Sequence, residues 1–563
     1  MWFNRNFACF YQEFMPNQDT VLTFPSLFSE TLQKFPEHNT FAFVGEEPIT
    51  YSQSHQRIQS VMALLEKLNA KPGDKIAILS SNMPNWGVTY FATTFMDAVV
   101  VPLLPDFHVF EIEKFMEHSG AEFLFISKSL QYKLKGIEHK MPETIILIDD
   151  FSVVRSKVKD VAYDAGAVAS KSYQVAENDM AAIIYTSGTT GKPKGVMLSH
   201  KNIAFTAIKA AIIQPIDDKD RFLSILPLSH TYENTLGLIL PMIYGACVYY
   251  LQKPPTPAVL IPAMQEVKPT LMLTVPLIIE KIYRNSILPT FTKKWIPRVL
   301  YKTAFVHNTL NLIAGRKLKK TFGGKLKFFG IGGAKLDKTV EKFLIEARFP
   351  YAIGYGLTET SPLLAGSSPF HTKLQSTGPA LDGIELKIID ADPTTGEGEI
   401  VARGPNVMQG YYKEPELTKS VFTDDGWFRT GDLGVMDRHD FLSIRGRLKN
   451  IIVMKSGENV YPEEIETVIN NFRYVDESLV VEQKGKLVAL VYFNKDEIAK
   501  KYEDLKTEMS IYIDQKIDEL KLELEIYVNK RVNKFSRLQT VIPQDDPFKK
   551  TATQKIKRFL YTK

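Results

Sequence analysis

The sequence predicts an α/β fold: a large N-terminal domain of mostly parallel sheets with a small β subdomain, followed by a small, mobile α+β C-terminal domain. Short apolar runs alternate with amphipathic segments through most of the 563 residues, which is typical of parallel sheets covered on both faces. After about residue 378, Pro, Gly and Asp turns separate the runs, as in a small antiparallel sheet. We therefore place the domains at 1–448 and 449–563, with the β subdomain at about 378–447.

The parallel strands are expected where short apolar runs are bounded by turn residues. These runs are 76–82, 99–104, 122–127, 144–149, 181–187, 222–227, 271–275, 326–332 and 351–356. Between the first runs and the N-terminus, the apolar residues of 54–69 recur with helical spacing and predict an amphipathic helix. In the C-terminal domain we expect a helix over 462–471 with proline in its first turn. A hairpin over 478–493, with Lys-Gly at its tip, and helices within 496–533 follow.

The longest uncharged stretch runs from Asn234 to Gln252 and nearly reaches the length of a membrane-spanning helix. Gly237, Pro241 and Gly245 interrupt it, and its last part is rich in strand-forming residues. We expect a buried helix, a turn and a strand here rather than a membrane span. A peripheral membrane contact stays open as an alternative.

The composition is that of a soluble globular protein, with 44% apolar and 24% charged residues. The net charge of +5 is small for this length, and we expect no nucleic-acid partner. Two cysteines, Cys9 and Cys247, are too few for a disulfide framework or a thiolate metal cluster, and they suit a cytoplasmic protein. The N-terminal residues contain no continuous apolar run of the secretory type.

The strongest local motif is Tyr-Thr-Ser-Gly-Thr-Thr-Gly-Lys-Pro-Lys-Gly over 185–195, which follows an apolar strand. Its hydroxyl groups, backbone N–H groups and two lysines can surround a polyphosphate. The spacing differs from that of a Walker A loop, because Lys192 is followed by Pro193. A second glycine-dense turn, Phe329–Ala334, lacks the third glycine of a dinucleotide fingerprint, since Lys335 stands there. It still permits a flat ligand to approach the backbone closely.

The motif at 185–195, together with 354–360, 426–434 and 445–449, resembles the adenylate-forming superfamily in order and spacing. The resemblance extends from about residue 20 to the end of the chain. Three further segments are similar to long-chain fatty acid–CoA ligases: 226–233, 403–412 and 456–465.

The resemblance implies two half-reactions. A carboxylate attacks the α-phosphate of ATP and expels pyrophosphate, and the thiol of CoA then attacks the acyl-adenylate and releases AMP. Both steps need Mg²⁺ or protein cations to offset phosphate charge, and neither needs an enzyme nucleophile. The implied partners are therefore a fatty acid, ATP, CoA and Mg²⁺.

The resemblance also implies which residues bind the nucleotide. Glu359 and Thr186 correspond to metal-binding positions, Thr358 to an α-phosphate contact, and Tyr355 to the residue stacked on adenine. Asp432 and Arg447 correspond to ribose or phosphate contacts. The remaining implied ATP-binding residues are Ser187, Gly188, Thr189, Thr190, Gly191, Lys194, Gly332, Gly333, Ala334 and Gly356.

Four further assignments concern the catalytic cycle. Lys555 resembles the C-terminal lysine that enters the site during adenylate formation, and Lys449 resembles a hinge. His230 corresponds to a catalytic position bordering the acyl site. The CoA tunnel is expected along Ser456, Gly457 and Glu458. Because Lys555 and this loop are needed in different steps, we expect the small domain to rotate about Lys449.

Alternatives remain at the level of substrate and acceptor. The acyl group could pass to an acyl carrier protein instead of CoA, and the acid could be aromatic. A catalytically silent lipid- or nucleotide-binding relative is a third alternative, against which the intact motif residues argue. We expect a cytoplasmic location, with peripheral contact at the inner face of the membrane as an alternative.

Overall fold

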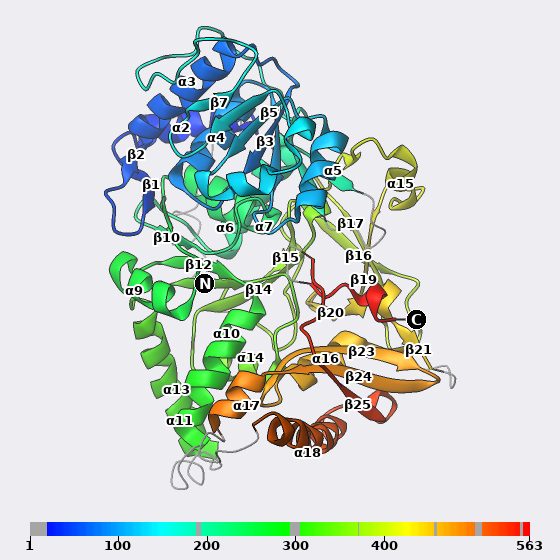
Figure 1. Cartoon of the computed structure of the whole chain (residues 1–563). Helices are drawn as coiled ribbons and strands as arrows, with labels where there is room; N and C mark the ends of the chain where they lie inside the picture. The colour runs from blue at the N-terminus through cyan, green and yellow to red at the C-terminus, as the bar shows by residue number, and fades with distance from the viewer. Residues whose placement is uncertain are drawn as a thin grey trace.

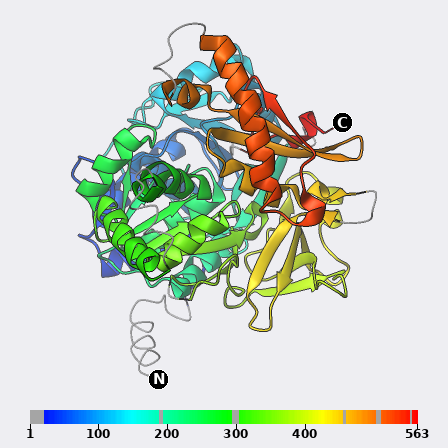
Figure 2. The same ribbon diagram turned by 90° about the horizontal axis from the view of Figure 1, so that it is seen from below.

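The computed structural model describes residues 20–186, 193–292, 304–369, 371–454, 459–501, 509–551 and 555–562. Two eight-stranded sheets form the larger N-terminal part, and a four-stranded β sheet follows them in the chain (Figure 1). The C-terminal part, coloured orange to red, lies beside the yellow four-stranded sheet in the view from below (Figure 2).

The first sheet has the strand order β18-β9-β8-β4-β3-β5-β6-β7, and its five central strands are parallel. Its strands are β3 (Lys75–Leu79), β4 (Val99–Leu103), β5 (Phe123–Ile126), β6 (Thr144–Leu147), β7 (Val153–Arg155), β8 (Met180–Thr186), β9 (Lys194–Ser199) and β18 (Gly410–Tyr411). The helices near it are α2 (Phe24–Lys34), α3 (Tyr51–Lys67), α4 (Pro84–Phe95), α5 (Val109–Ser119) and α6 (His200–Ile213). All the strands predicted in this half, and the helix predicted over 54–69, are confirmed.

The second sheet has the order β15-β14-β13-β12-β10-β11-β1-β2. Its strands are β1 (Asn39–Phe43), β2 (Ile49–Thr50), β10 (Arg221–Ser224), β11 (Cys247–Tyr250), β12 (Leu271–Thr274), β13 (Phe328–Ile331), β14 (Tyr351–Gly356) and β15 (Leu363–Gly366). Its helices are α7 (Thr231–Glu233), α8 (Leu240–Ile243), α9 (Pro257–Val267), α10 (Pro276–Ile282), α11 (Leu288–Thr292), α13 (Ala304–Thr321) and α14 (Lys338–Glu346). The N-terminal strand β1 joins this sheet beside β11, a pairing that the sequence pattern did not predict.

The core between the sheets is built around α4. This helix is buried on every side from Trp86 to Phe95, and it contacts β4 of the first sheet and β1 of the second. The helix has no charged residue, and its apolar and threonine side chains are buried on all sides, as is typical of a helix in the centre of a large core. The main hydrophobic cluster accordingly contains residues of both sheets.

The uncharged stretch 234–252 folds as expected. It forms a buried π-helical turn (Asn234–Ile239), helix α8 and strand β11. Among the described residues, no helix has the length and apolar character needed to cross a bilayer.

The antiparallel β subdomain and the C-terminal α+β elements are also present. The subdomain consists of β16 (Glu385–Ile389), β17 (Gly398–Arg403), β19 (Phe428–Met436) and β20 (Leu442–Arg447), with α15 (Pro415–Ser420) nearby. After it come β21 (Ile452–Val453), β22 (Asn459–Val460), α16 (Pro462–Asn470), β23 (Val475–Gln483), β24 (Lys486–Phe493), α17 (Lys495–Lys501), α18 (Met509–Asn529) and β25 (Thr540–Gln544). The predicted hairpin is confirmed: Lys484 and Gly485 at its tip both have positive φ, as a type I′ turn requires.

Candidate active site

A carboxylate and a guanidinium face each other across two strands of the β subdomain. Asp432 on β19 is paired in register with Arg447 on β20, and Arg447 Nε lies 2.9 Å from Asp432 Oδ1. The hydroxyl of Tyr355, at the end of β14, donates to Asp432 Oδ2 over 2.9 Å. Burial raises the pKa of Asp432, whereas Arg447 and the Tyr355 hydrogen bond lower it. Each carboxylate oxygen keeps a lone pair for a ligand hydroxyl.

Glu359 lies in a short helical turn, Thr358–Thr360, that follows β14. Tyr411 of β18 donates its hydroxyl to Glu359 Oε1 over 2.9 Å. The Lys194 ammonium lies 5.8 Å from the centre of the Tyr411 ring. Glu359 Oε2 accepts no hydrogen bond from the described residues, so it is available to a cation. Thr358 precedes Glu359 in the same turn and is partly exposed.

Gly356 has a structural reason to be glycine. A Cβ atom at this position would lie 1.7 Å from the carbonyl oxygen of Pro362, far inside any allowed contact. The backbone therefore needs glycine to turn from β14 into β15 and to hold the Glu359 turn against the sheet.

Lys555 and Lys449 lie close to these carboxylates. Burial of the Lys555 ammonium lowers its pKa, Arg447 and Lys449 lower it further, and Asp432 and Glu359 oppose the effect. The residue as a whole is nevertheless exposed, so it is the ammonium end that lies among protein charges. Burial, Arg447 and another cation likewise lower the pKa of Lys449.

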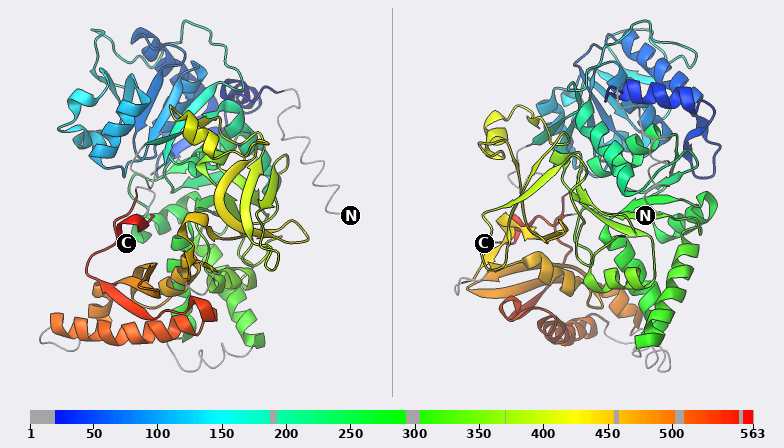
Figure 3. Two further views of the ribbon diagram at one scale, coloured as in Figure 1. Left: turned by 90° about the vertical axis from the view of Figure 1, so that its right-hand side faces the viewer. Right: turned by 180° about the vertical axis from the view of Figure 1, so that it is seen from behind.

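The C-terminal segment is held by its own contacts. The red trace runs up from β25 towards the N-terminal part (Figures 1 and 3). Lys555 exchanges hydrogen bonds with Thr551, and Arg558 forms an ion pair with the largely buried side chain of Glu466 on α16. Burial raises the pKa of Glu466 to about 7, against the effect of Arg558. These contacts fix the segment to the C-terminal domain and leave the Lys555 side chain directed at the site.

His230 is a further residue that the charge of Lys555 reaches. It caps α7, where its Nδ1 accepts from the backbone N–H of Tyr232 over 3.3 Å. A neutral ring in this position carries its hydrogen on Nε2. Burial, with the Lys555 charge adding to it, lowers the pKa of His230 to about 4, so the ring is neutral at pH 7.

The glycine turn after β13 accommodates an aromatic ring. Ideal Cβ atoms at Gly330 and Gly332 would lie 3.0 and 3.2 Å from atoms of Tyr232, so both glycines make room for its side chain. Gly333 has a φ of +84°, and Gly333 and Ala334 are exposed. The backbone of Gly333 and Ala334 is thus open to a ligand.

Thr186 and Lys194 end β8 and begin β9, and they are paired in register. The predicted loop residues between them, Ser187, Gly188, Thr189, Thr190 and Gly191, lie outside the described residues, as do Ser456, Gly457 and Glu458. The strand pairing therefore brings the two ends of the loop together at the carboxyl end of β8, the edge at which ligands bind in such sheets.

Three contacts near the site were missed by sequence reasoning. One is the Tyr411 hydroxyl on Glu359, although Tyr411 lies within the 403–412 motif. The other two join the β subdomain or N-terminal part to the C-terminal domain: Tyr461 donates to Glu397 over 2.6 Å, and Lys335 Nζ lies 2.8 Å from Glu464 Oε1. A single sequence gives no signal for such long-range pairs.

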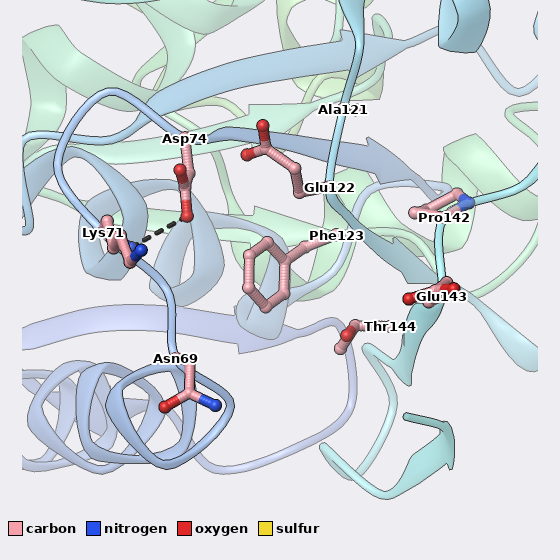
Figure 4. A pocket seen from close by; sticks show the side chains of 9 residues that line it. All are labelled: Asn69, Lys71, Asp74, Ala121, Glu122, Phe123, Pro142, Glu143 and Thr144. Atoms are coloured by element: carbon pink, nitrogen blue, oxygen red, sulfur yellow. Dashed lines mark hydrogen bonds between the residues drawn. The ribbon is translucent and has the colours of Figure 1, made fainter. Parts of the chain in front are cut away.

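A separate pocket lies at the opposite edge of the first sheet. It is formed at the amino ends of β3, β5 and β6 (Figure 4), and its lining residues are Asn69, Lys71, Asp74, Ala121, Glu122, Phe123, Pro142, Glu143 and Thr144. Burial, together with the neighbouring Asp74, raises the pKa of Glu122. Since parallel α/β sheets bind ligands at their carboxyl ends, this pocket is distinct from the candidate active site.

The two-sheet fold, with its β subdomain and α+β C-terminal part, defines the class of adenylate-forming enzymes. The profile described as "AMP-binding enzyme" matches residues 28–412, and "AMP-binding enzyme C-terminal domain" matches residues 449–563. The chain therefore belongs to the AMP-binding enzyme family, and the predicted superfamily is confirmed.

Similar proteins are found among both sequences and structures. A long-chain-fatty-acid–CoA ligase of Rattus norvegicus is 26% identical over 84% of this chain and 77% of its own length. Long chain acyl-CoA synthetase 1 of Arabidopsis thaliana is 28% identical over 87% of this chain and 82% of its own. The o-succinylbenzoate CoA synthetase of Bacillus subtilis with its acyl-adenylate intermediate has a TM-score of 0.74 and 23% identity, and 95% of this chain and 97% of that one are covered. The same enzyme with ATP and magnesium ion also has a TM-score of 0.74, with 24% identity and 95% and 98% covered. At this identity the structural likeness concerns the fold.

Proposed function

We propose that this AMP-forming acid–CoA ligase takes a long-chain fatty acid as its substrate. The proposal rests on the long-chain specificity named for the relatives, which cover most of this chain. The acid is activated as the acyl-adenylate with release of pyrophosphate, and CoA then receives the acyl group and releases AMP.

The observation that carries the chemistry is the charge balance of the site. Three cations, Arg447, Lys449 and Lys555, act on the carboxylates of Glu359 and Asp432, and Lys194 adds a fourth positive charge close to Lys449. The net positive charge suits a triphosphate, whose negative charge must be offset while the α-phosphate is attacked. Asp432 binds the ribose hydroxyls, and the open backbone of Gly333 and Ala334 receives the adenine beside Tyr355.

The residues present fit Mg²⁺. Glu359 offers a carboxylate oxygen that no described residue occupies, and Thr186 supplies a hydroxyl at the end of β8. Mg²⁺ prefers such hard oxygen ligands and commonly binds through one carboxylate, water and substrate phosphates. Bound there, the ion supplies further offset of phosphate charge.

Lys555 is the mobile member of the site. In the first step its ammonium lies against the α-phosphate and stabilises the charge that develops there. In the second step the small domain turns about Lys449, Lys555 leaves, and the loop with Ser456, Gly457 and Glu458 lines the path of CoA. His230, neutral at pH 7, borders the acyl group and offers its Nε2 hydrogen.

The test is pyrophosphate exchange. Purified protein with Mg²⁺ and labelled ATP should incorporate pyrophosphate only when an acid is added, and it should do so best with C16–C18 acids among saturated, unsaturated and aromatic candidates. CoA should then release AMP. Exchange with aromatic acids alone would contradict the proposal that the substrate is a long-chain fatty acid. AMP release with acyl carrier protein but not with CoA would contradict the proposal that CoA is the acceptor.

We also propose a cytoplasmic location with peripheral contact at the inner face of the membrane. The uncharged 234–252 stretch is buried in the fold, so it is not available for this contact.

A further inference from the structure

The positive charge of the chain is concentrated in one region. Residues 281–336 contain 13 Lys and Arg residues and no Asp or Glu. Because the whole chain has a net charge of +5, the rest of it has a net charge of −8. This stretch of the sequence therefore carries an excess of positive charge, although Lys327 and Lys335 within it form ion pairs with Asp220 and Glu464.

Helix α13 presents part of this charge to solvent. Arg316, Lys317 and Lys320 are exposed, and their spacing places them on one face of the helix. Ile313, one turn earlier on the same face, is 55% exposed. The outward stripe of α13 thus combines three cations with a large apolar side chain, the pattern of a helix that lies on a membrane surface.

Helix α9 extends the stripe. Gln265 Nε2 donates to the carbonyl oxygens of Lys320 and Thr321, over 2.9 and 2.7 Å, and so joins α9 to the end of α13. Ile261, one turn before Gln265, is 46% exposed, and Lys268 at the end of α9 is exposed beside Gly323. We define the α9–α13 face as the following residues: Ile261, Lys268, Ile313, Arg316, Lys317 and Lys320.

The cations of the α9–α13 face have no acidic partners within the part of the chain that the structure describes. None of the four forms an ion pair there, and the nearby Glu346 is engaged by His307, Asn311 and Lys342. Both helices lie at the outer edge of the molecule in Figure 1 and in the view from behind in Figure 3. The face is therefore free to meet an anionic partner.

We infer that the α9–α13 face binds the surface of an anionic lipid bilayer. The cations match the charge of the headgroups, and the two exposed isoleucines can enter the boundary between headgroups and acyl chains. Nucleic-acid phosphates would use the cations equally but would leave the isoleucines in water. The inference deepens the proposed function, because a long-chain fatty acid partitions into bilayers and would be collected there.

Vesicle flotation of the full-length protein tests the inference. Wild type should float with vesicles of phosphatidylcholine containing 30% phosphatidylglycerol at low salt, and it should not float with pure phosphatidylcholine. The Arg316→Gln/Lys317→Gln/Lys320→Gln variant should bind roughly a hundredfold more weakly, since each cation near such a surface contributes about a factor of 5. Ile313→Ser should weaken binding without changing its salt dependence.

A matched control removes the same charge elsewhere. Lys67, Lys135 and Lys171 are exposed on the first half of the chain, and their triple change to Gln should float like wild type. Equal loss in both triple variants, no binding by wild type, or binding to duplex DNA but not to vesicles would each overturn the inference. Flotation measures membrane binding without enzyme turnover, and pyrophosphate exchange can be measured with detergent-dispersed acid without a membrane. The two assays therefore distinguish a failure of membrane binding by the α9–α13 face from a failure of the proposed substrate.

Discussion

At the scale of single residues, the site is a set of charges whose neighbours determine their protonation. The carboxylate of Asp432 lies between a guanidinium and a phenol, which keep it a hydrogen-bond acceptor despite its burial. His230 is neutral because it is buried beside Lys555. The motifs identified these residue types, and the contacts explain how they can act together.

Lys555 provides the first prediction at this scale. Lys555→Ala should lower acyl-adenylate formation by at least about a hundredfold, because removal of one charge-stabilising donor costs about that much. Thioester formation from supplied acyl-adenylate should stay within about threefold of wild type. The two half-reactions are measured separately. Equal loss of both rates would contradict a role of Lys555 in adenylate formation alone. Lys557→Ala, two residues away, is the matched control and should leave both rates unchanged.

Glu233 provides a prediction about stability. It is buried, and burial raises its pKa from the ordinary value of about 4.5 to about 8. The folded state therefore holds a proton that the unfolded state has released between these two values, so stability should fall as pH rises from 4.5 to about 8. The slope can reach about 1.4 kcal/mol per pH unit.

Urea unfolding between pH 5 and 8 measures this effect. Glu233→Gln keeps the shape of the neutral acid and should make the slope smaller. At pH 8 the Glu233→Gln variant should therefore be more stable than the wild type. If Glu233→Gln and wild type changed in parallel with pH, the protonation of Glu233 would be excluded as the cause.

At the scale of elements, the turn from β14 into β15 shows how local backbone geometry supports the site. Gly356 lets the two strands approach, and the side-chain amide of Asn406 donates to the carbonyl oxygens of Thr360 and Leu363, over 2.9 and 3.1 Å. The Glu359 turn is therefore held by strand pairing and by a buried amide, in addition to the hydrogen bond that Tyr411 donates to the Glu359 side chain.

Gly356→Ala should destabilise the fold severely. The new methyl group would meet the Pro362 carbonyl, and relief of such overlap costs about 3 kcal/mol or more through displaced backbone. The urea midpoint should fall, and exchange activity should fall with it. Gly166→Ala is the control, because its Cβ would meet nothing closer than 3.5 Å. A wild-type midpoint for Gly356→Ala would contradict the close strand approach.

At the scale of the whole molecule, a few contacts hold the C-terminal domain where Lys555 enters the site. Lys335 pairs with Glu464 on α16, and Tyr461 donates to Glu397 of the β subdomain. These partly exposed contacts are weak enough to be broken when the domain turns, since such ion pairs contribute about 0.2–1 kcal/mol.

Lys335→Glu should therefore favour the other domain orientation. Adenylate formation should fall by about two- to fivefold, and thioester formation should hold or rise. The reversed pair Lys335→Glu/Glu464→Lys should restore the first rate. The rates of the two half-reactions, measured separately, test this prediction. If the double variant formed adenylate no faster than Lys335→Glu alone, the ion pair would have no part in the domain orientation.

Much of the fold and of the site was predictable from local patterns. Most of the parallel strands of both sheets, the 484–485 turn and the buried 234–252 segment follow from apolar periodicity and from glycine and proline positions. Strand β1 and the short strands β2, β7 and β15 were not predicted. The pairing of β1 with β11 was not predictable, because a single sequence does not show which strands far apart in the chain lie side by side. The hydrogen bonds of Tyr411 and Tyr461 could not be predicted for the same reason.

The sequence by itself determined the class of enzyme, because its motifs are short stretches in which neighbouring residues share one loop or turn. Only the tertiary structure decided that Tyr355, 77 residues from Asp432, donates to that carboxylate, and that Lys555 reaches Arg447 and His230. It also decided that the cations of α13 face solvent together with two isoleucines. The physical reason is that charges and hydrogen bonds act over a few ångströms in space, whatever the separation along the chain.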